Sequence, residues 1–196
     1  MIGSKNLKEI FSALDHQIGA QKGSSIGLVV CGGTALAALG LMRRTTKDVD
    51  VLAEAEETER GLAIHSIEQF PAWLTAAAKV VARDFGLPEQ WLNLGPASQA
   101  ASGLPEGFAS RLVKKSYGVY LTIFFTGRTD QIYFKLYAAV DRDDYHVQDL
   151  FALKPEDAEI EKATQWVLTQ DVSTAFRSIL IDFLERHGYG AIAERI

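Results

Sequence analysis

An apolar run over residues 26–31 (IGLVVC), followed directly by two glycines, constrains the fold of this chain more than any other feature. Its valines are β-branched, so the run predicts a short buried strand. The next three residues, Gly32, Gly33 and Thr34, predict a tight turn. Alanine and glycine dominate residues 35–42, which predicts a short helix that packs closely on the strand. We therefore expect a sheet covered by helices.

The remaining elements follow from the spacing of apolar residues. Helical spacing predicts helices over residues 6–18, 71–85, 144–153, 155–168 and 172–187. Alternating or β-branched and aromatic segments predict strands over residues 47–52, 117–126 and 131–134. Residues 89–110 contain several glycines and prolines and predict a long irregular loop. These elements predict an α+β fold: a core over 1–140 with an N-terminal helix and a mixed sheet flanked by helices, and a C-terminal helical region over 141–196 that packs on it.

Composition excludes several classes of protein. The chain has 196 residues, and Cys31 is its single cysteine, so a disulfide framework is excluded and a reducing, cytoplasmic setting is expected. No window approaches 18 unbroken apolar residues, and we expect neither a transmembrane helix nor a signal peptide. The net charge of −5 argues against a protein that coats nucleic acid without specificity. We expect any RNA contact at two local basic patches: Arg43, Arg44 and Lys47, and Arg111, Lys114 and Lys115.

Two carboxylates carry the chemistry of the predicted strand over residues 47–52. Asp48 and Asp50 are separated by one residue, so the period of a strand places both side chains on one face. Neighbouring carboxylates repel each other unless a cation lies between them. Oxygen ligands of this kind suit Mg²⁺ or Mn²⁺, together with water and substrate phosphates. The pair therefore predicts a divalent-metal site.

The upstream turn offers a phosphate cradle. Gly32 and Gly33 leave the backbone unobstructed, and Thr34 supplies a hydroxyl where N–H groups at a helix start attract phosphate oxygens. Arg44 and Lys47 add positive charge. Taken alone, a Gly-Gly-Thr turn or an Asp-x-Asp pair is usually a plain turn or a solvated strand face. Together, in this order and at this spacing, they are a much more specific signal of a phosphate cradle linked to a metal pair by a short helix.

The segment from the apolar strand through Gly-Gly-Thr to Arg-x-Thr-x-Asp-x-Asp (residues 44–50) resembles the nucleotidyltransferase superfamily that includes DNA polymerase beta. In that superfamily the glycines contact the triphosphate and the two aspartates bind Mg²⁺. The form RTTKDVDVL looks closest to the bacterial abortive-infection and MenT-type toxin branch and to small uncharacterised relatives. This resemblance implies a nucleotidyltransferase, and as a toxin it implies an antitoxin partner.

The second half of the chain resembles the same branch. Lys135, Arg142 and the segment 146–150 (HVQDL) are similar to its lysine, arginine and Asp-Leu block. In that branch the lysine contacts nucleotide phosphates and the aspartate is needed for activity, which implies catalytic roles for Lys135 and Asp149. The residues alone also allow a surface lysine at a strand end and an aspartate that caps or salt-bridges a helix.

The chain departs from the wider superfamily in its third carboxylate. The predicted strand over 117–126 contains no Asp or Glu, which leaves Asp130 or Asp149 as substitutes. Three hypotheses follow. The first is a magnesium-dependent enzyme that transfers a nucleotidyl group from a nucleoside triphosphate (NTP) to a hydroxyl of RNA or protein. The second is a catalytically decayed module that binds a nucleotide or a partner protein. The third is a structural helical adaptor in which the two aspartates are incidental.

Overall fold

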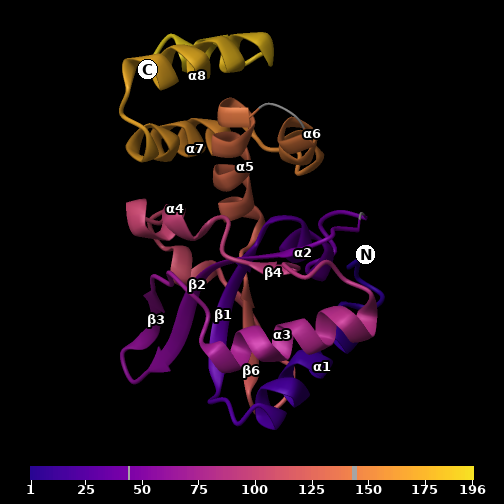
Figure 1. Cartoon of the computed structure of the whole chain (residues 1–196). Coiled ribbons are helices and arrows are strands. Elements are labelled where there is room, and N and C mark those ends of the chain that lie inside the picture. The colour runs from indigo at the N-terminus through magenta and orange to yellow at the C-terminus, as the bar shows by residue number, and fades with distance from the viewer. Residues whose placement is uncertain (44, 143–144) are drawn as a thin grey trace. The chain divides into compact units, whose positions relative to one another are not determined.

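The computed structural model describes residues 1–43, 45–142 and 145–196 (Figure 1). Contacts divide the chain into two compact units, Met1–Gly127 and Arg128–Ile196. The expected boundary between residues 140 and 141 falls within the last turn of a helix, α5 (Arg128–Arg142). Each unit is described separately below.

The first unit is built on a mixed sheet with strand order β3-β2-β1-β6-β5. The short strand β4 pairs with the first two residues of β2, on the side of β2 away from β1. The strands are β1 (Ile26–Cys31), β2 (Val49–Thr58), β3 (Gly61–His65), β4 (Leu92–Asn93), β5 (Val113–Ser116) and β6 (Leu121–Phe125). The β1–β6 and β2–β4 pairs are parallel, whereas the other neighbours are antiparallel. With the helices below, this sheet confirms the predicted α+β class.

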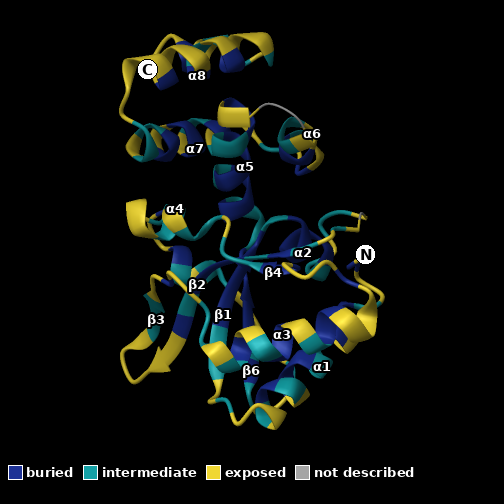
Figure 2. Ribbon diagram, in the orientation of Figure 1, coloured by how far each residue is buried: buried dark blue, intermediate teal, exposed yellow. Residues whose placement is uncertain are grey.

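Helices α1 (Leu7–Ala20) and α3 (Ala72–Phe85) lie side by side on one face of the sheet (Figure 1). Apolar side chains on their inner faces share one core with β1, β2 and β6. Figure 2 shows this division, with buried β1 inside and the exposed residues of α3 outside. The short helix α2 (Gly32–Ala38) follows β1 directly, and α4 (Ala97–Ser102) and a 3₁₀ turn, η1 (Phe108–Arg111), lie between β4 and β5. The core thus fixes the last residues of β1 and the first residues of β2, which are paired beside the start of α2.

Several elements differ from expectation. The Gly32–Thr34 segment forms the first turn of α2 rather than a separate turn. Strand β2 runs on to Thr58 and forms an unexpected hairpin with β3. The strand expected over 117–126 begins only at Leu121, because a tight reversal joins it to β5. The expected loop over 89–110 contains β4, α4 and the first residues of η1.

The second unit is helical. After α5 it comprises α6 (Tyr145–Ala152), α7 (Asp157–Gln170), α8 (Thr174–Arg186) and α9 (Gly190–Ala193). The strand predicted over residues 131–134 is wrong, because these residues lie inside α5. Trp166 of α7 packs edge-on against Tyr133 and Phe134 of α5, at ring-centroid distances of 5.8 and 5.5 Å. The helix predicted over 144–153 corresponds to α6, although residue 144 itself lies outside the described residues. Within the described ranges, every helix is too short or too polar to span a lipid bilayer.

Arg128 ties the start of α5 to the start of α7. Its guanidinium donates to the carbonyls of Leu153 and Lys154 and to the carboxylate of Glu159, with Nη1 2.5 Å from Oε1. The side-chain hydrogen bond from Arg128 lowers the pKa of Glu159 below its usual range. Glu159 also accepts from the backbone N–H of Glu156 and completes a capping box.

This pKa shift predicts an acid-dependent contribution to stability. A carboxylate whose folded pKa is depressed stabilises the fold above its unfolded pKa and loses that contribution as the pH falls through the folded value. We expect Glu159→Gln to lower the urea midpoint at pH 7, and the difference from wild type to shrink below about pH 4.5. Urea titrations across this range check it, with exposed Glu185→Gln as the control. A difference that does not shrink at all as the pH falls would contradict the assignment.

Candidate active site

Asp48 and Asp50 meet at one open hollow in the first unit. Asp48 immediately precedes β2, and Asp50 is the second residue of β2, opposite Cys31 of β1. Both aspartates and Lys47 line a hollow of about 600 Å³. Its other lining residues come from the segment between α3 and α4: Pro88, Gln90, Asn93 and Gly95. The structure therefore brings the two predicted carboxylates and one predicted cation to the same space.

Two threonines hold Asp48. The hydroxyl of Thr34 in α2 donates to the main-chain carbonyl of Asp48 at 2.8 Å. The hydroxyl of Thr46 donates to Asp48 Oδ1 at 2.6 Å. Asp48 is partly exposed, so its backbone is anchored to α2 while its carboxylate borders the hollow.

Asn93 of β4 holds Asp50. Its Nδ2 donates to Asp50 Oδ1 at 3.2 Å and to the carbonyl of Val49 at 3.4 Å. Its own Oδ1 accepts from the N–H of Gly95 at 2.8 Å. The sequence pattern does not place Asn93 beside the two aspartates, because this residue lies in the segment expected to be irregular. Only the parallel pairing of β4 with β2 places it beside Asp50.

Gly32 lies directly against the other carboxylate oxygen of Asp50. A Cβ atom at this position would lie 2.5 Å from Asp50 Oδ2, and the φ angle of Gly32 is +66°. Glycine therefore satisfies both a left-handed backbone and a close approach that a side chain would block. The predicted glycine thus touches the site, although its contact is with the carboxylate.

The other predicted nucleotide-binding residues fall in different places. Gly33 and Thr34 are buried, and the Thr34 hydroxyl is engaged by Asp48. Lys47 is exposed beside the aspartates. Arg44 lies outside the described residues. Phosphate contacts by Gly32, Gly33, Thr34 and Arg44 remain predictions.

The donor set fits a divalent cation. Mg²⁺ is usually bound through one or two carboxylates and keeps several waters, and two carboxylates at an open hollow match that requirement. Among the described residues, no group of three or more His, Cys, Asp or Glu side chains is arranged to hold a metal ion. The site therefore offers a carboxylate pair with room for water and phosphate oxygens as the remaining ligands.

Lys135 and Asp149 lie together in the second unit. Lys135 is in the middle of α5, so its expected position at a strand end is wrong. Its Nζ donates to Asp149 Oδ2 of α6 at 2.8 Å, and both side chains are almost fully buried. The ammonium also lies 5.7 Å from the ring centre of Tyr145 and 3.5 Å from His146 Nδ1. Asp130, the other candidate for a third carboxylate, is buried in the first turn of α5.

Two further expectations meet other contacts. Trp91, in the segment expected to be a loop, is fully buried, and its indole N–H donates to the carbonyl of Ala78 at 2.9 Å. In the second basic patch, Lys114 pairs with Glu57 and Lys115 donates to the carbonyl of Ala38. Part of the charge proposed to meet RNA is therefore engaged within the fold.

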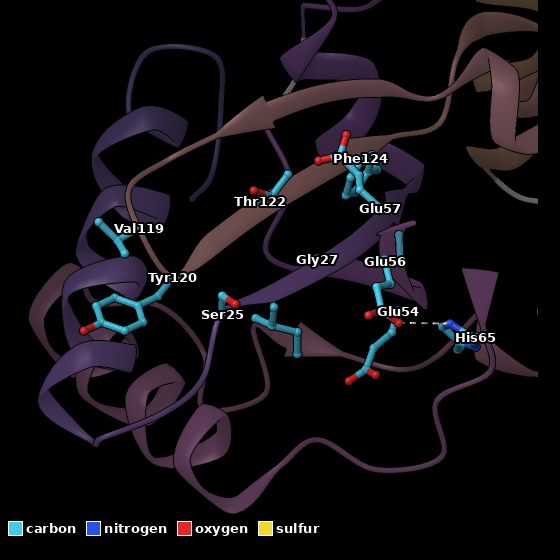
Figure 3. Close-up of a pocket in the computed structure, with 12 residues that line it drawn as sticks. Ser25, Gly27, Glu54, Glu56, Glu57, His65, Val119, Tyr120, Thr122 and Phe124 are labelled. Carbon is cyan, nitrogen blue, oxygen red and sulfur yellow. Dashed lines mark ion pairs between the residues drawn. The ribbon is translucent and has the colours of Figure 1, made fainter. Parts of the chain in front are cut away.

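A second hollow of about 340 Å³ lies toward the opposite end of β1 (Figure 3). Three glutamates of β2 (Glu54, Glu56 and Glu57) line it together with His65 of β3, and Glu56 lies 3.7 Å from the ring of His65. None of the residues predicted as site residues lines this hollow. The sequence motif therefore selects the hollow at Asp48 and Asp50.

Comparison with known proteins places the chain in a family. A family model described as a nucleotidyltransferase of unknown function (DUF6036) matches residues 5–154. That range includes the glycines, both aspartates, Lys135 and Asp149. Comparison with curated proteins and with solved structures gave no match. Because the family model covers well over half of its length, this chain belongs to the DUF6036 family of nucleotidyltransferases of unknown function.

Proposed function

We propose that the chain transfers a nucleotidyl group from an NTP to a hydroxyl group of RNA or protein, with Mg²⁺ or Mn²⁺ held by Asp48 and Asp50. The observation that carries this proposal is that both carboxylates border one open hollow beside Lys47. Family membership supports the reaction class and implies the NTP. The resemblance of the Arg-x-Thr-x-Asp-x-Asp segment to the toxin branch supports a toxin role with an antitoxin partner.

The chain's own residues would divide the work of binding. Asp48 and Asp50 supply the oxygen ligands, and Asn93, which also lines the hollow, keeps Asp50 oriented through its hydrogen bond. Lys47 places a positive charge where the polyphosphate enters. Gly32 leaves the space beside Asp50 free of a side chain. When bound, the metal neutralises negative charge on the triphosphate.

The transfer exchanges one phosphorus–oxygen bond for another. The acceptor hydroxyl oxygen forms a bond to the α-phosphorus, and the bond from that phosphorus to the bridging oxygen breaks. Pyrophosphate leaves with the electron pair, and the hydroxyl proton passes to water. Resemblance assigns Lys135 and Asp149 to this reaction as well, and that assignment remains a proposal.

The variant Asp48→Asn tests the proposed reaction. We expect Asp48→Asn to lower transfer from α-³²P-labelled NTPs to total RNA or total protein by more than about 100-fold, which exceeds the usual loss from an outer-shell contact. Asp84→Asn removes an exposed carboxylate on α3 that pairs with Arg83 and serves as the matched control. Undiminished labelling by Asp48→Asn would contradict the role of Asp48.

A binding-only module is the second candidate function. The absence of a third acidic or histidine ligand at the pair, within the described residues, favours it. Calorimetry with each NTP, paired with a pyrophosphate assay, distinguishes the two. Binding that is independent of Mg²⁺ and yields no pyrophosphate would favour the module over the enzyme.

A further inference from the structure

The backbone of Thr46 is fixed from the core of the first unit. The N–H of Ile2 donates to the carbonyl of Thr46 at 2.7 Å, and the N–H of Thr46 donates to the carbonyl of Ile2 at 2.8 Å. These two bonds form an isolated antiparallel bridge. Ile2 is fully buried among core side chains. The position of Thr46 therefore depends on main-chain contacts and on Ile2, and its own side chain is not needed for this bridge.

The Thr46 side chain serves a different contact. Its hydroxyl donates to Asp48 Oδ1 at 2.6 Å, which is a short, charge-assisted distance for an O–H donor to a carboxylate. The main-chain carbonyl of Asp48 is held separately by Thr34, and the Asp48 N–H also donates to the Thr46 hydroxyl oxygen in a long bond of 3.5 Å. With its backbone anchored, Asp48 retains rotation about its side-chain bonds, and the bond from Thr46 restricts that rotation.

We propose that Thr46 is a positioning residue that orients the Asp48 carboxylate toward the hollow as a metal ligand. This inference rests on the proposed function, because the orientation of the Asp48 carboxylate matters for activity only if Asp48 binds the cation. Hydrogen bonds from outer residues fix the orientation of ligating side chains, and their loss typically weakens metal binding by about 10–100-fold. Thr46 does not contact the cation itself in this proposal.

The neighbouring threonine provides a matched control. Thr45 is exposed, and replacing it with valine makes the same chemical change one residue away from Thr46. Thr46→Val keeps the shape of the side chain and removes the hydroxyl, whereas Thr46→Ser keeps the hydroxyl. The bridge to Ile2 uses main-chain atoms and is available in all three variants.

The test measures Mn²⁺ affinity of the full chain without nucleotide, by electron paramagnetic resonance of unbound Mn²⁺. We expect Thr46→Val to weaken Mn²⁺ binding by about 10–100-fold. Thr46→Ser and Thr45→Val should bind close to wild type. Thermal unfolding in EDTA should be similar for all four proteins, since the main-chain bridge to Ile2 is retained and Thr46→Val loses, besides the bond to the carboxylate, only a long bond of 3.5 Å from the Asp48 N–H.

Each other outcome overturns the inference. Wild-type Mn²⁺ affinity in Thr46→Val would show that the hydroxyl does not orient Asp48. A lower unfolding temperature in EDTA for Thr46→Val, with no rescue by Thr46→Ser, would show a purely structural role. If wild type binds no Mn²⁺ and releases no pyrophosphate, the proposed function fails as well. If wild type binds Mn²⁺ and only Asp48→Asn loses it, the proposed function stands and the role of Thr46 fails.

Discussion

Gly32→Ala is expected to reduce nucleotidyl transfer by about 100-fold or more, because the new methyl group would displace the carboxylate of Asp50. The Cβ of an alanine at this position would lie 2.5 Å from Asp50 Oδ2, well inside van der Waals contact. Asn93 holds the opposite oxygen of the same carboxylate, so Asp50 cannot turn aside without breaking that bond. A shift of about 1 Å in a catalytic group is enough for a loss of this size.

Gly40 supplies the control for this substitution. It lies just beyond the other end of α2, its φ angle is +68°, and no neighbouring atom lies within 4 Å of a Cβ built there. Alanine in a left-handed backbone costs about 1–2 kcal/mol at either position. Urea unfolding of Gly40→Ala should therefore report the loss from backbone strain alone, and Gly32→Ala should lose at least as much stability, because its methyl group also clashes with Asp50.

Of these two variants, only Gly32→Ala should lose pyrophosphate release and Mn²⁺ binding. The comparison separates backbone strain from damage to the carboxylate, because the strain is common to both variants. Equal activity of the two folded variants would show that the contact between Gly32 and Asp50 does not matter for the reaction. Equal loss of activity would point to a general effect on α2.

The shared location of the two aspartates was predictable because their signal is local. A strand period and a spacing of two residues place Asp48 and Asp50 on one side, and the structure brings both to the same hollow. Asn93 was not predictable in this way. It contacts Asp50 from 43 residues away, through a strand of two residues that no periodic pattern marks. A site residue that depends on pairing between distant strands leaves no trace in a single sequence.

The error over residues 131–134 has a physical reason. Ile132, Tyr133 and Phe134 are β-branched or aromatic and individually favour a strand. Burial of Ile132, Leu136 and Ala139 follows helical spacing instead, and packing on α7 decides the outcome. Helix α5 thus places Lys135 inside the second unit, where a strand end would have left it at a surface. Tertiary packing overrode local propensity here.

The ion pair between Lys135 and Asp149 is expected to have the largest effect on stability. The side chains are 6% and 1% exposed. Removing one partner of a buried ion pair typically costs about 3–5 kcal/mol. We therefore expect Lys135→Met and Asp149→Leu, each alone, to destabilise the second unit by that amount. Urea unfolding followed by far-ultraviolet circular dichroism measures it, because this unit is helical.

An exposed ion pair in the same unit provides the comparison. Arg186 and Asp182 lie one turn apart on α8, with 53% and 64% of their side chains exposed. Exposed pairs typically contribute less than about 1 kcal/mol, so Arg186→Met should have little effect. A similar loss for Arg186→Met and Lys135→Met would contradict the argument from burial.

The double variant Lys135→Met/Asp149→Leu separates stability from catalysis. Replacing both partners of a buried pair by apolar residues removes both buried charges and is often neutral for stability. We expect the double variant to recover most of the stability that either single variant loses. If the two residues act on the nucleotide, as resemblance to the toxin branch implies, this folded protein will still lack transfer activity. Full activity of the stable double variant would instead assign the pair to the fold alone, and Asp48 and Asp50 would carry the chemistry without it.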